Sequence, residues 1–398
     1  MSKPATHNPF RIFSAPGRVE IGGNHTDHQH GRVLAAAIGL EITAAVTVSG
    51  SSLCTLRCVH SNGKWKEENG KIEDEGAAGS DIFVDLGMLD VVPEETGTSA
   101  AFVRGVASWF NAHGYAVGGF DASVSSTIPI GAGLSSSAAF AVLIGNIFKG
   151  LFGADIPPID IARAGQFAEN VYFGKPCGLM DQAASSFGGL NIIDFADPQK
   201  PVVTPVSAEL PGYSMCVVNT GGSHADLTPD YAAAPNEMKA VAAHFGKGFL
   251  REVDSGEFYA SVPDLRRLGD RAILRAIHFF NDNNRVLKQA AALENGDIET
   301  FFDLVIESGR SSLAYLQNVF SPSSPLQQGL TLALALSERM LEGAGAWRVH
   351  GGGFAGTILA FVPDELKRDY DLQMSGVFGE GCCHFLSIRK EGGRECKV

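Results

Sequence analysis

The sequence predicts an α+β protein of two domains, and three observations support this. Residues 33–48 are rich in Ala, Ile and Val and have the composition of a buried strand. The run from Ala138 to Phe152 is apolar on nearly every face, which is typical of a buried helix. The length of 398 residues, with a second half dominated by helical patterns, exceeds one ordinary domain.

The first half continues this mixture. Leu53 to His60 keeps a β pattern, and we expect Lys64 to Gly79 to form an exposed excursion. A helix is predicted from Ser99 to about His113, followed by a strand at Phe120 to Ser126. Pro157 and Pro158 then mark the end of the buried helix.

A cluster of prolines at positions 198, 201 and 205 precedes the apolar segment Ser214 to Asn219. Because prolines punctuate regular structure, we place the domain boundary there, which gives an N-terminal domain of residues 1–205 and a C-terminal domain of residues 206–398.

In the second domain, Ser324-Pro325 predicts the start of a helix, with Ser as the N-cap and Pro in the first turn. That helix is expected to reach about Glu342 and to stop at Gly343. The last predicted strands are Trp347 to His350, Thr357 to Val362 and Cys383 to Ile388.

The composition excludes several classes of function. Lys and Arg number 31 against 44 Asp and Glu, a net charge of −13, and no basic run is present. Such a field repels nucleic acid and anionic membranes, so neither is expected as a primary partner. Seven cysteines without CxxC spacing argue against a disulfide framework and a structural zinc site. The N-terminus lacks a secretory signal pattern, and the most apolar stretch is too short to span a bilayer, so we expect a cytoplasmic protein.

Residues 16–31 form the first segment that is dense in chemical groups. It reads PGRVEIGGNHTDHQHG, with a concentration of His25, Asp27, His28 and His30. Three interpretations stay open for these residues alone: a metal cluster, although the spacing fits no standard zinc motif, a solvated loop, or a clamp for vicinal sugar hydroxyls beside an Arg that meets phosphate.

The second segment reads PIGAGLSSSAA from Pro129 and lies between a predicted strand and the buried helix. Its glycines allow close approach of the backbone, and the helix N-terminus presents free N–H groups to an anion. It is not a Walker A loop, because the Gly-Lys-Ser/Thr ending is missing. A capped helix with spare serines is the alternative.

A third segment, GGGFAG from Gly351, satisfies GxGxxG only formally, since a strand-like run follows where a dinucleotide site needs a helix. A Gly-rich hairpin packed on another loop is the better interpretation. Glu169 and Asp181 are acids in an otherwise apolar, Gly-broken stretch, and each alone is more often a surface carboxylate.

Taken together and in this order, the segments resemble the GHMP kinase superfamily and its galactokinase branch. APGRV with GNHTD is similar to the galactokinase signature, PIGAGLSSSAA to the ATP loop, CGLMDQ to the segment with the catalytic Asp, and GGGFAG to the third motif. These matches extend from residue 14 to about residue 362.

The resemblance implies a ribosomal protein S5 domain 2-like N-terminal domain and a ferredoxin-like C-terminal domain, with the active site between them. Asp181 matches the catalytic base and Arg18 the Arg beside it, while Ser137 and Glu169 match the Mg²⁺ positions. The positions implied to wrap the ATP phosphates are Gly131, Ala132, Gly133, Leu134, Ser135, Ser136 and Ser137. The positions implied to contact the sugar are Asn24, His25, Thr26, Asp27, Gly178 and Tyr231.

The sequence departs from this branch at three places. Galactokinases carry a Glu that contacts the C6 hydroxyl where Asn24 stands, and a Tyr where His28 stands. After Tyr231 the chain reads AAAP, where galactokinases usually have Asn and paired Arg. Because a neutral Asn removes repulsion toward a C6 carboxylate, galacturonate is the alternative substrate to galactose.

The implied activity is transfer of a phosphoryl group from ATP, with Mg²⁺, to the anomeric hydroxyl of a monosaccharide. Asp181 would accept the proton of that hydroxyl, and Arg18 would keep Asp181 ionised, which also weakens it as a base. The rival from another class is a non-catalytic sensor of sugar or ATP. A sugar and ATP are the expected partners, and a monomer is the expected oligomeric state.

Overall fold

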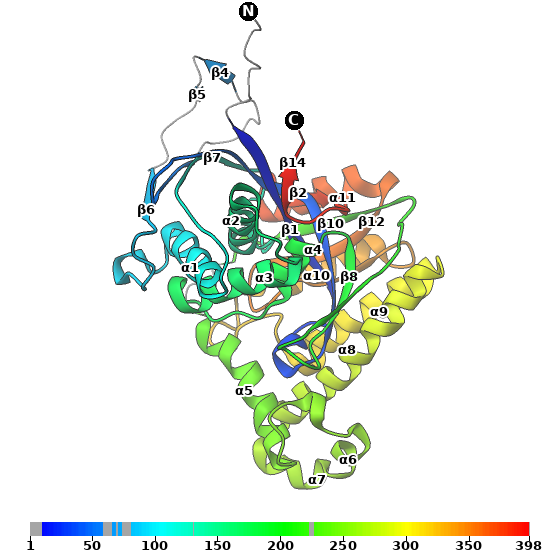
Figure 1. Ribbon diagram of the computed structural model, residues 1–398. Helices are drawn as coiled ribbons and strands as arrows, with labels where there is room; N and C mark the ends of the chain where they lie inside the picture. The colour runs from blue at the N-terminus through cyan, green and yellow to red at the C-terminus, as the bar shows by residue number, and fades with distance from the viewer. Residues whose placement is uncertain are drawn as a thin grey trace, which may run out of the picture.

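The computed structural model describes residues 10–58, 66–68, 71–73, 81–129, 131–222 and 227–397. Two larger β-sheets, a two-stranded ribbon and the helices make up this part of the chain (Figure 1). The predicted exposed excursion at residues 64–79 lies mostly outside the described residues, which there include the paired short strands β4 (Lys66–Glu68) and β5 (Lys71–Glu73).

The larger sheet has eight strands in the order β14-β1-β2-β7-β3-β6, and β8 pairs with both β2 and β9. Neighbouring strands are antiparallel except β3 and β7. The strands are β1 (Arg11–Gly22), β2 (Arg32–Val48), β3 (Leu53–Cys58), β6 (Ile82–Asp85), β7 (Phe120–Ser126), β8 (Leu190–Asp194), β9 (Val202–Pro205) and β14 (Arg394–Cys396).

Four helices cover this sheet, and they are α1 (Ser99–Ala112), α2 (Ser136–Phe152), α3 (Pro158–Phe167) and α4 (Met180–Phe187). Helices α2 and α4 contact both β1 and β2. The largest core fills the space between, with Phe13, Phe110 and Phe148 completely buried. β1 and α2 share this core, whereas the apolar side chains of α4 pack with Val33 and Ala35 of β2 in a separate cluster. Together these contacts hold β1 beside α2 and α4.

The second sheet is antiparallel, in the order β11 (Ala346–Val349), β12 (Thr357–Pro363), β10 (Tyr213–Asn219) and β13 (Cys383–Leu386). Its helices are α5 (Thr228–His244), α6 (Ser255–Ala260), α7 (Val262–Leu265), α8 (Asp270–Glu294), α9 (Ile298–Ser311), α10 (Gly329–Leu341) and α11 (Lys367–Phe378). Figure 1 shows α5, α6 and α7 at the lower end of the molecule, where they share a separate core with the first half of α8.

Short 3₁₀ segments are η1 (Asp27–Gln29), η2 (Pro93–Glu95), η4 (Leu250–Glu252), η5 (Arg266–Leu268) and η7 (Asp364–Leu366), and η3 (Ala168–Phe173) and η6 (Ser312–Leu316) are π-helical. No helix in the described ranges is long and apolar enough to cross a membrane.

The predicted α+β class is confirmed, as are the buried helix α2, the strand β7 and the helix α1. The predicted start of a helix at Ser324-Pro325 was wrong. Residues 321–328 form turns, in which Ser324 N–H donates to Ser321 O and Gln327 N–H to Ser324 O, and α10 begins only at Gly329.

The last predicted strand is shorter than expected, because the chain leaves the second sheet after Leu386. Ile388 bridges Ile38 of β2, and β14 then pairs with β1. The larger sheet therefore contains strands from both sides of residue 205, although the remaining strands divide between the sheets at that point.

Candidate active site

Arg18 and Asp181 form the centre of the candidate site. Arg18 lies in β1 and Asp181 in the first turn of α4, and their side chains make a bidentate pair with Nε–Oδ1 2.7 Å and Nη2–Oδ2 2.8 Å. Ser135 Oγ also donates to Asp181 Oδ2. Burial alone would raise the pKa of Asp181, but the Arg18 charge and these hydrogen bonds hold it below its ordinary value. Asp181 is therefore an ionised acceptor and a weak base.

The predicted ATP loop lies directly on this pair. Arg18 Nη1 donates to Gly133 O at 2.6 Å, and Arg18 N–H donates to Leu134 O at 3.2 Å. Gly131 and Gly133 have φ of 76° and 68°, a region that glycine adopts at low cost. Helix α2 begins at Ser136, and no side chain caps its first turn. Its free N–H groups are therefore available to an anion.

Ser137 and Glu169 approach one another beside the start of α2. Ser137 Oγ donates to Glu169 Oε1 at 3.2 Å, and Gln182 Nε2 donates to Glu169 Oε2 at 2.8 Å. Burial raises the pKa of Glu169, and Lys175 opposes that rise from 4.0 Å. Two hard oxygen donors at an anion-binding helix start fit Mg²⁺, which usually takes few protein ligands and completes its shell with phosphates and water. Within the described ranges, no group of three or more His, Cys, Asp or Glu could hold a metal ion, so the metal-cluster interpretation of residues 25–30 does not hold there.

Asn24 does not face a substrate site in this structure. Its side chain is 0% exposed, and every hydrogen-bonding position of the amide is used. Nδ2 donates to Glu20 Oε1 (3.0 Å) and Gly351 O (2.6 Å), and Oδ1 accepts from Ser312 Oγ (3.3 Å) and Asn318 Nδ2 (2.9 Å). The expected contact with C6 of the sugar therefore does not match the geometry, and Asn24 joins β1, the hairpin and η6 instead.

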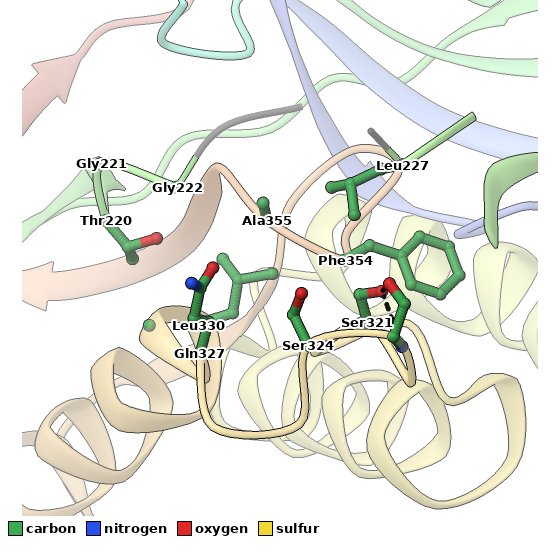
Figure 2. Close-up of a pocket in the computed structure, with 12 residues that line it drawn as sticks. Thr220, Gly221, Gly222, Leu227, Ser321, Ser324, Gln327, Leu330, Phe354 and Ala355 are labelled. Carbon is green, nitrogen blue, oxygen red and sulfur yellow. Dashed lines mark hydrogen bonds between the residues drawn. The ribbon is translucent and has the colours of Figure 1, made fainter. Parts of the chain in front are cut away.

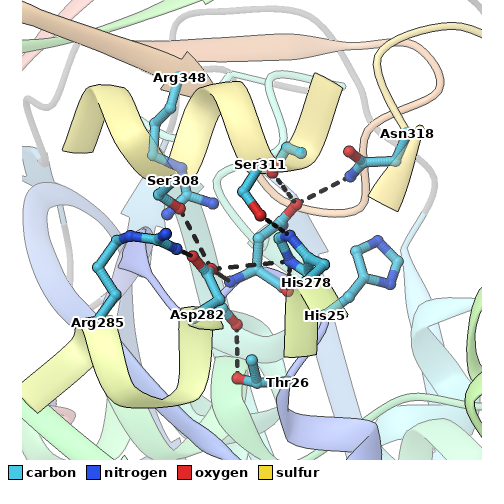
Figure 3. A network of polar contacts seen from close by, with 12 residues as sticks. His25, Thr26, His278, Asp282, Arg285, Ser308, Ser311, Asn318 and Arg348 are labelled. Atoms are coloured by element: carbon cyan, nitrogen blue, oxygen red, sulfur yellow. Dashed lines mark hydrogen bonds and ion pairs between the residues drawn. The ribbon is translucent and has the colours of Figure 1, made fainter. Parts of the chain in front are cut away.

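The backbone of Asn24 is held as firmly as its side chain. Its N–H donates to Asp282 Oδ2 at 2.9 Å and its carbonyl accepts from His278 Nε2 at 2.9 Å, both from the buried face of α8. Figure 3 shows His278, Asp282, Ser311 and Asn318 converging on this point. This network fixes the left-handed conformation of the next residue, His25 (φ 57°).

The two ring nitrogens of His25 are also engaged. Nε2 lies 2.9 Å from Gly352 O and therefore donates, so Nδ1 accepts from His28 Nε2 at 3.0 Å. Burial lowers the pKa of His25 to about 4, and the His28 ring is likewise neutral. Thr26 is 0% exposed and its hydroxyl lies at the carbonyls of Gly23 and Arg32, so it folds the loop rather than facing a ligand.

Asp27, Gly178 and Tyr231 are the predicted sugar positions that remain. A Cβ on Gly178 would lie 2.3 Å from Asp27 Oδ2, so only glycine lets the two segments meet. Burial raises the pKa of Asp27 to about 6, the Asp181 charge adds to the rise and Arg18 opposes it. Tyr231, in α5, donates to Gly353 O at 2.8 Å.

The GGGFAG segment is a hairpin between β11 and β12 that packs on other loops, as predicted. Asn24, His25, Asn318 and Tyr231 all contact its carbonyls. At its base, Glu20 N–H donates to His350 Nε2 at 3.2 Å, and Arg348 Nη2 pairs with Glu20 Oε1 at 2.9 Å. The hairpin thereby joins the second sheet to β1.

A pocket of about 270 Å³ lies beside this hairpin (Figure 2). Phe354 and Ala355 line it from the hairpin, and Thr220, Ser324 and Gln327 line it from neighbouring loops. It contains none of the predicted site residues.

Sequence reasoning missed the supporting residues Ser312, Asn318, His278 and Asp282, and the role of Ser135 as a partner of Asp181. Only His278 and Asp282 could have been grouped from the sequence, because their i, i+4 spacing places them on one face of α8. The remaining contacts depend on tertiary folding and have no local pattern.

Comparisons with known proteins agree with this geometry. A family model described as GHMP kinases N terminal domain matches residues 101–189, and one described as galactokinase galactose-binding signature matches residues 4–48. A galactokinase of Glaesserella parasuis is 28% identical over 352 residues, which cover 88% of this chain and 85% of that protein.

Two solved structures are similar in fold. The Lactococcus lactis galactokinase complexed with galactose has a TM-score of 0.79 at 23% identity, covering 97% of this chain and 95% of that one. The Methanococcus jannaschii mevalonate kinase has a TM-score of 0.64 at 16% identity, covering 97% and 99%. Its two matching family models and its galactokinase relative thus make the chain similar to the galactokinase branch of the GHMP kinases, and it shares their fold.

Proposed function

We propose that this protein is a galactokinase, which transfers the γ-phosphoryl group of ATP to the anomeric hydroxyl of galactose to give galactose 1-phosphate and ADP. The observation that carries the proposal is the bidentate Arg18–Asp181 pair under the ATP loop. It supplies a fixed anionic acceptor for a sugar hydroxyl and a cation beside it, next to a helix N-terminus suited to phosphate.

Asp181 acts mainly by orientation in this proposal. Its depressed pKa makes it a poor acceptor for a full proton in the ground state, but a good hydrogen-bond acceptor that aims the hydroxyl oxygen at phosphorus. The proton moves to Asp181 as the bond to phosphorus forms, when the acidity of the hydroxyl rises. Arg18, 6% exposed, then faces the charge that develops on the transferring group.

Residues 131–137 and the first N–H groups of α2 surround the ATP phosphates in this account. Ser137 and Glu169 would hold Mg²⁺, which when bound neutralises charge on the phosphate oxygens. Because burial raises the pKa of Glu169, a bound cation would also favour its ionised form.

Asp27, the backbone at Gly178, and Tyr231 contact the sugar in this account. The case for galacturonate rested on a neutral Asn24 facing C6. Since the Asn24 amide is buried and fully hydrogen-bonded, that argument no longer favours a uronate.

A turnover assay with a panel of sugars tests the function. ADP release is measured with galactose, glucose, galactosamine, mannose and galacturonate at equal concentrations. We expect galactose to give the highest kcat/KM. A preference for galacturonate would reject the substrate, and binding without turnover of any sugar would favour the sensor.

We further propose that the chain is a cytoplasmic monomer whose halves, 1–205 and 206–398, act as two domains around the site. All seven cysteines are free, as in a reducing compartment. The Arg18–Asp181 pair, the ATP loop and the Ser137–Glu169 contact assemble within this one chain, which supports a site that is complete in a monomer. Light scattering during gel filtration tests the monomer.

A further inference from the structure

Ser135 occupies the N-cap position of α2 but does not cap the helix. Its backbone is left-handed, with φ 58° and ψ 54°, and its side chain makes no cap hydrogen bond. A serine at this position ordinarily accepts from an N–H group of the first turn. Here the hydroxyl turns away from the helix and donates to Asp181 Oδ2. The first turn of α2 thus keeps its N–H groups free, while Asp181 gains a third donor.

The same loop is joined to the Arg18–Asp181 pair at two further points. Gly133 O accepts from Arg18 Nη1 and Leu134 O accepts from the Arg18 N–H. Three consecutive loop residues therefore contact the pair. Any movement of the loop toward a nucleotide acts directly on the group that receives the sugar.

The Ser135 hydroxyl has one hydrogen and can donate it to one acceptor at a time. A carboxylate accepts about four hydrogen bonds, and Asp181 already accepts three, two of them on Oδ2. A phosphate oxygen is a charged acceptor that competes well for a hydroxyl hydrogen. The Ser135 hydroxyl thus has two alternative acceptors: Asp181 Oδ2 at the sugar site and a phosphate oxygen at the nucleotide site.

We propose that Ser135 couples the two substrate sites: its hydroxyl donates to Asp181 when nucleotide is absent and to a phosphate oxygen when ATP is bound, which opens Asp181 Oδ2 to the anomeric hydroxyl. This inference rests on the proposed function and adds to it a direction of regulation. Nucleotide binding strengthens sugar binding, and by linkage the sugar strengthens nucleotide binding by the same factor. Ser135 is in this respect a positioning residue for Asp181.

The test compares galactose binding by calorimetry with and without a saturating, non-hydrolysable ATP analogue and Mg²⁺. For the wild type we expect Kd for galactose to fall about tenfold when the analogue is present. Ser135→Gly removes the hydroxyl and keeps the left-handed backbone, which glycine adopts readily. In this variant the Kd for galactose without the analogue, divided by the Kd with it, should be within about twofold of one. Without the analogue, the variant should bind galactose more tightly than the wild type does.

Tighter galactose binding by Ser135→Gly is the most diagnostic result, because general damage to the site would weaken galactose binding. Gln317→Gly is the matched control, since it also places a glycine at a left-handed position (φ 59°) but lies outside the ATP loop and does not contact Asp181, and it should keep the tenfold ratio. If Ser135→Gly does not fold, as judged by near-UV circular dichroism, Ser135→Ala is used in its place.

A wild-type ratio near one, or a tenfold ratio retained in Ser135→Gly, would overturn the coupling. Turnover of galactose is measured on the same wild-type preparation. Turnover without coupling rejects this inference alone, whereas absence of turnover rejects the proposed function and the inference with it.

Discussion

At the scale of single residues, Asn24 shows how a position in a binding signature can serve the fold instead of the ligand. Its side chain and backbone together make six hydrogen bonds to β1, the 351–353 hairpin, α8, η6 and Asn318. An amide suits this site because it supplies two donors and two acceptors in one plane. A carboxylate supplies acceptors only.

Asn24→Glu should therefore destabilise the protein. The new carboxylate would lie beside Glu20 Oε1 and Gly351 O, which now accept hydrogen bonds from Nδ2. Buried acceptors that face one another without donors cost about 2–4 kcal/mol, measured as the free energy of unfolding in urea.

The double variant Glu20→Gln/Asn24→Glu is the control, because it restores one donor and one carboxylate to the pair and should recover part of the loss. An Asn24→Glu protein as stable as the wild type, with faster galactose turnover, would show that this side chain faces the sugar.

Some contacts of single residues in the site could be predicted from the sequence, and others could not. Arg18 and Asp181, 163 positions apart, were paired correctly in expectation because their motifs resemble a known family. The Ser135–Asp181 contact was not predicted, since it depends on a left-handed serine that no local pattern announces. His25 is a similar case, because only the folded hairpin supplies the carbonyl that occupies its Nε2.

At the scale of elements, the site depends on close approach between segments that lie far apart in sequence. The loop before α4 meets η1 at Gly178, where the Cα lies against the Asp27 carboxylate. The loop cannot move far from η1, because α4, which follows it, is packed on β1 and β2.

Gly178→Ala should displace Asp27 and weaken sugar binding. The added Cβ would lie 2.3 Å from Asp27 Oδ2, closer than any real contact. We expect KM for galactose to rise about 10–100-fold while KM for ATP changes less than about threefold, because Asp27 does not contact the ATP loop. Steady-state kinetics in both substrates measures this.

Gly376→Ala, in the open surface of α11 where a Cβ meets nothing within 4 Å, is the matched control and should leave both constants unchanged. An unaltered galactose KM in Gly178→Ala would remove Asp27 from the sugar site.

Elements with strong periodicity were predicted well, and those set by tertiary contacts were not. Helix α2 and strands β2 and β7 were predicted correctly, because most of their residues are buried and a run of apolar residues therefore marks each of them in the sequence. The start of α10 was misplaced because Ser321 bonds Asp230 and the following residues form turns, a choice that Ser-Pro alone does not reveal. The return of β14 to the first sheet depends on its pairing with β1.

At the scale of the whole molecule, buried titratable groups predict how stability depends on pH. Burial lowers the pKa of His25 to about 4 and lowers the pKa of His28, His278 and His350. Burial raises the pKa of Glu20 to about 7 and of Asp27 to about 6. The histidines and the carboxyls act in opposite directions.

Near pH 5.5 the unfolded chain binds protons on these histidines more readily than the folded chain does, whereas the folded chain keeps protons on Glu20 and Asp27. We expect the histidines to outweigh the two carboxyls, so that unfolding takes up protons and stability falls as pH drops from 6.5 toward 5. Above pH 6.5 the histidines are neutral in the unfolded chain as well and no longer change the free energy of unfolding. Glu20, whose pKa is about 7, ionises in the folded chain, so the free energy of unfolding should level off near pH 7.

Urea unfolding at several pH values measures this slope. His278→Gln should reduce the proton uptake, because burial lowers the pKa of His278 in the folded chain. A stability that rises on acidification, or a slope that His278→Gln leaves unchanged, would contradict these assignments.

The two larger sheets are joined through β1, where Arg18 pairs with Asp181 of α4 and Glu20 pairs with Arg348 of β11. Figure 1 shows β1 within the larger sheet. We expect β1 and α4 together to hold a sugar hydroxyl beside Asp181 while that hydroxyl is phosphorylated by ATP. Two results should follow. The new phosphate should lie on the anomeric oxygen, and turnover should depend on Asp181, which orients the hydroxyl.

Phosphorus NMR of the reaction of galactose with ATP tests both expectations. The wild type should form a phosphate on the anomeric oxygen of galactose. In Asp181→Asn, which keeps the shape of the side chain, kcat should fall by about 10²–10⁴ while Kd for ATP changes less than about twofold. A phosphate on C6, or near-normal turnover in Asp181→Asn, would contradict these expectations.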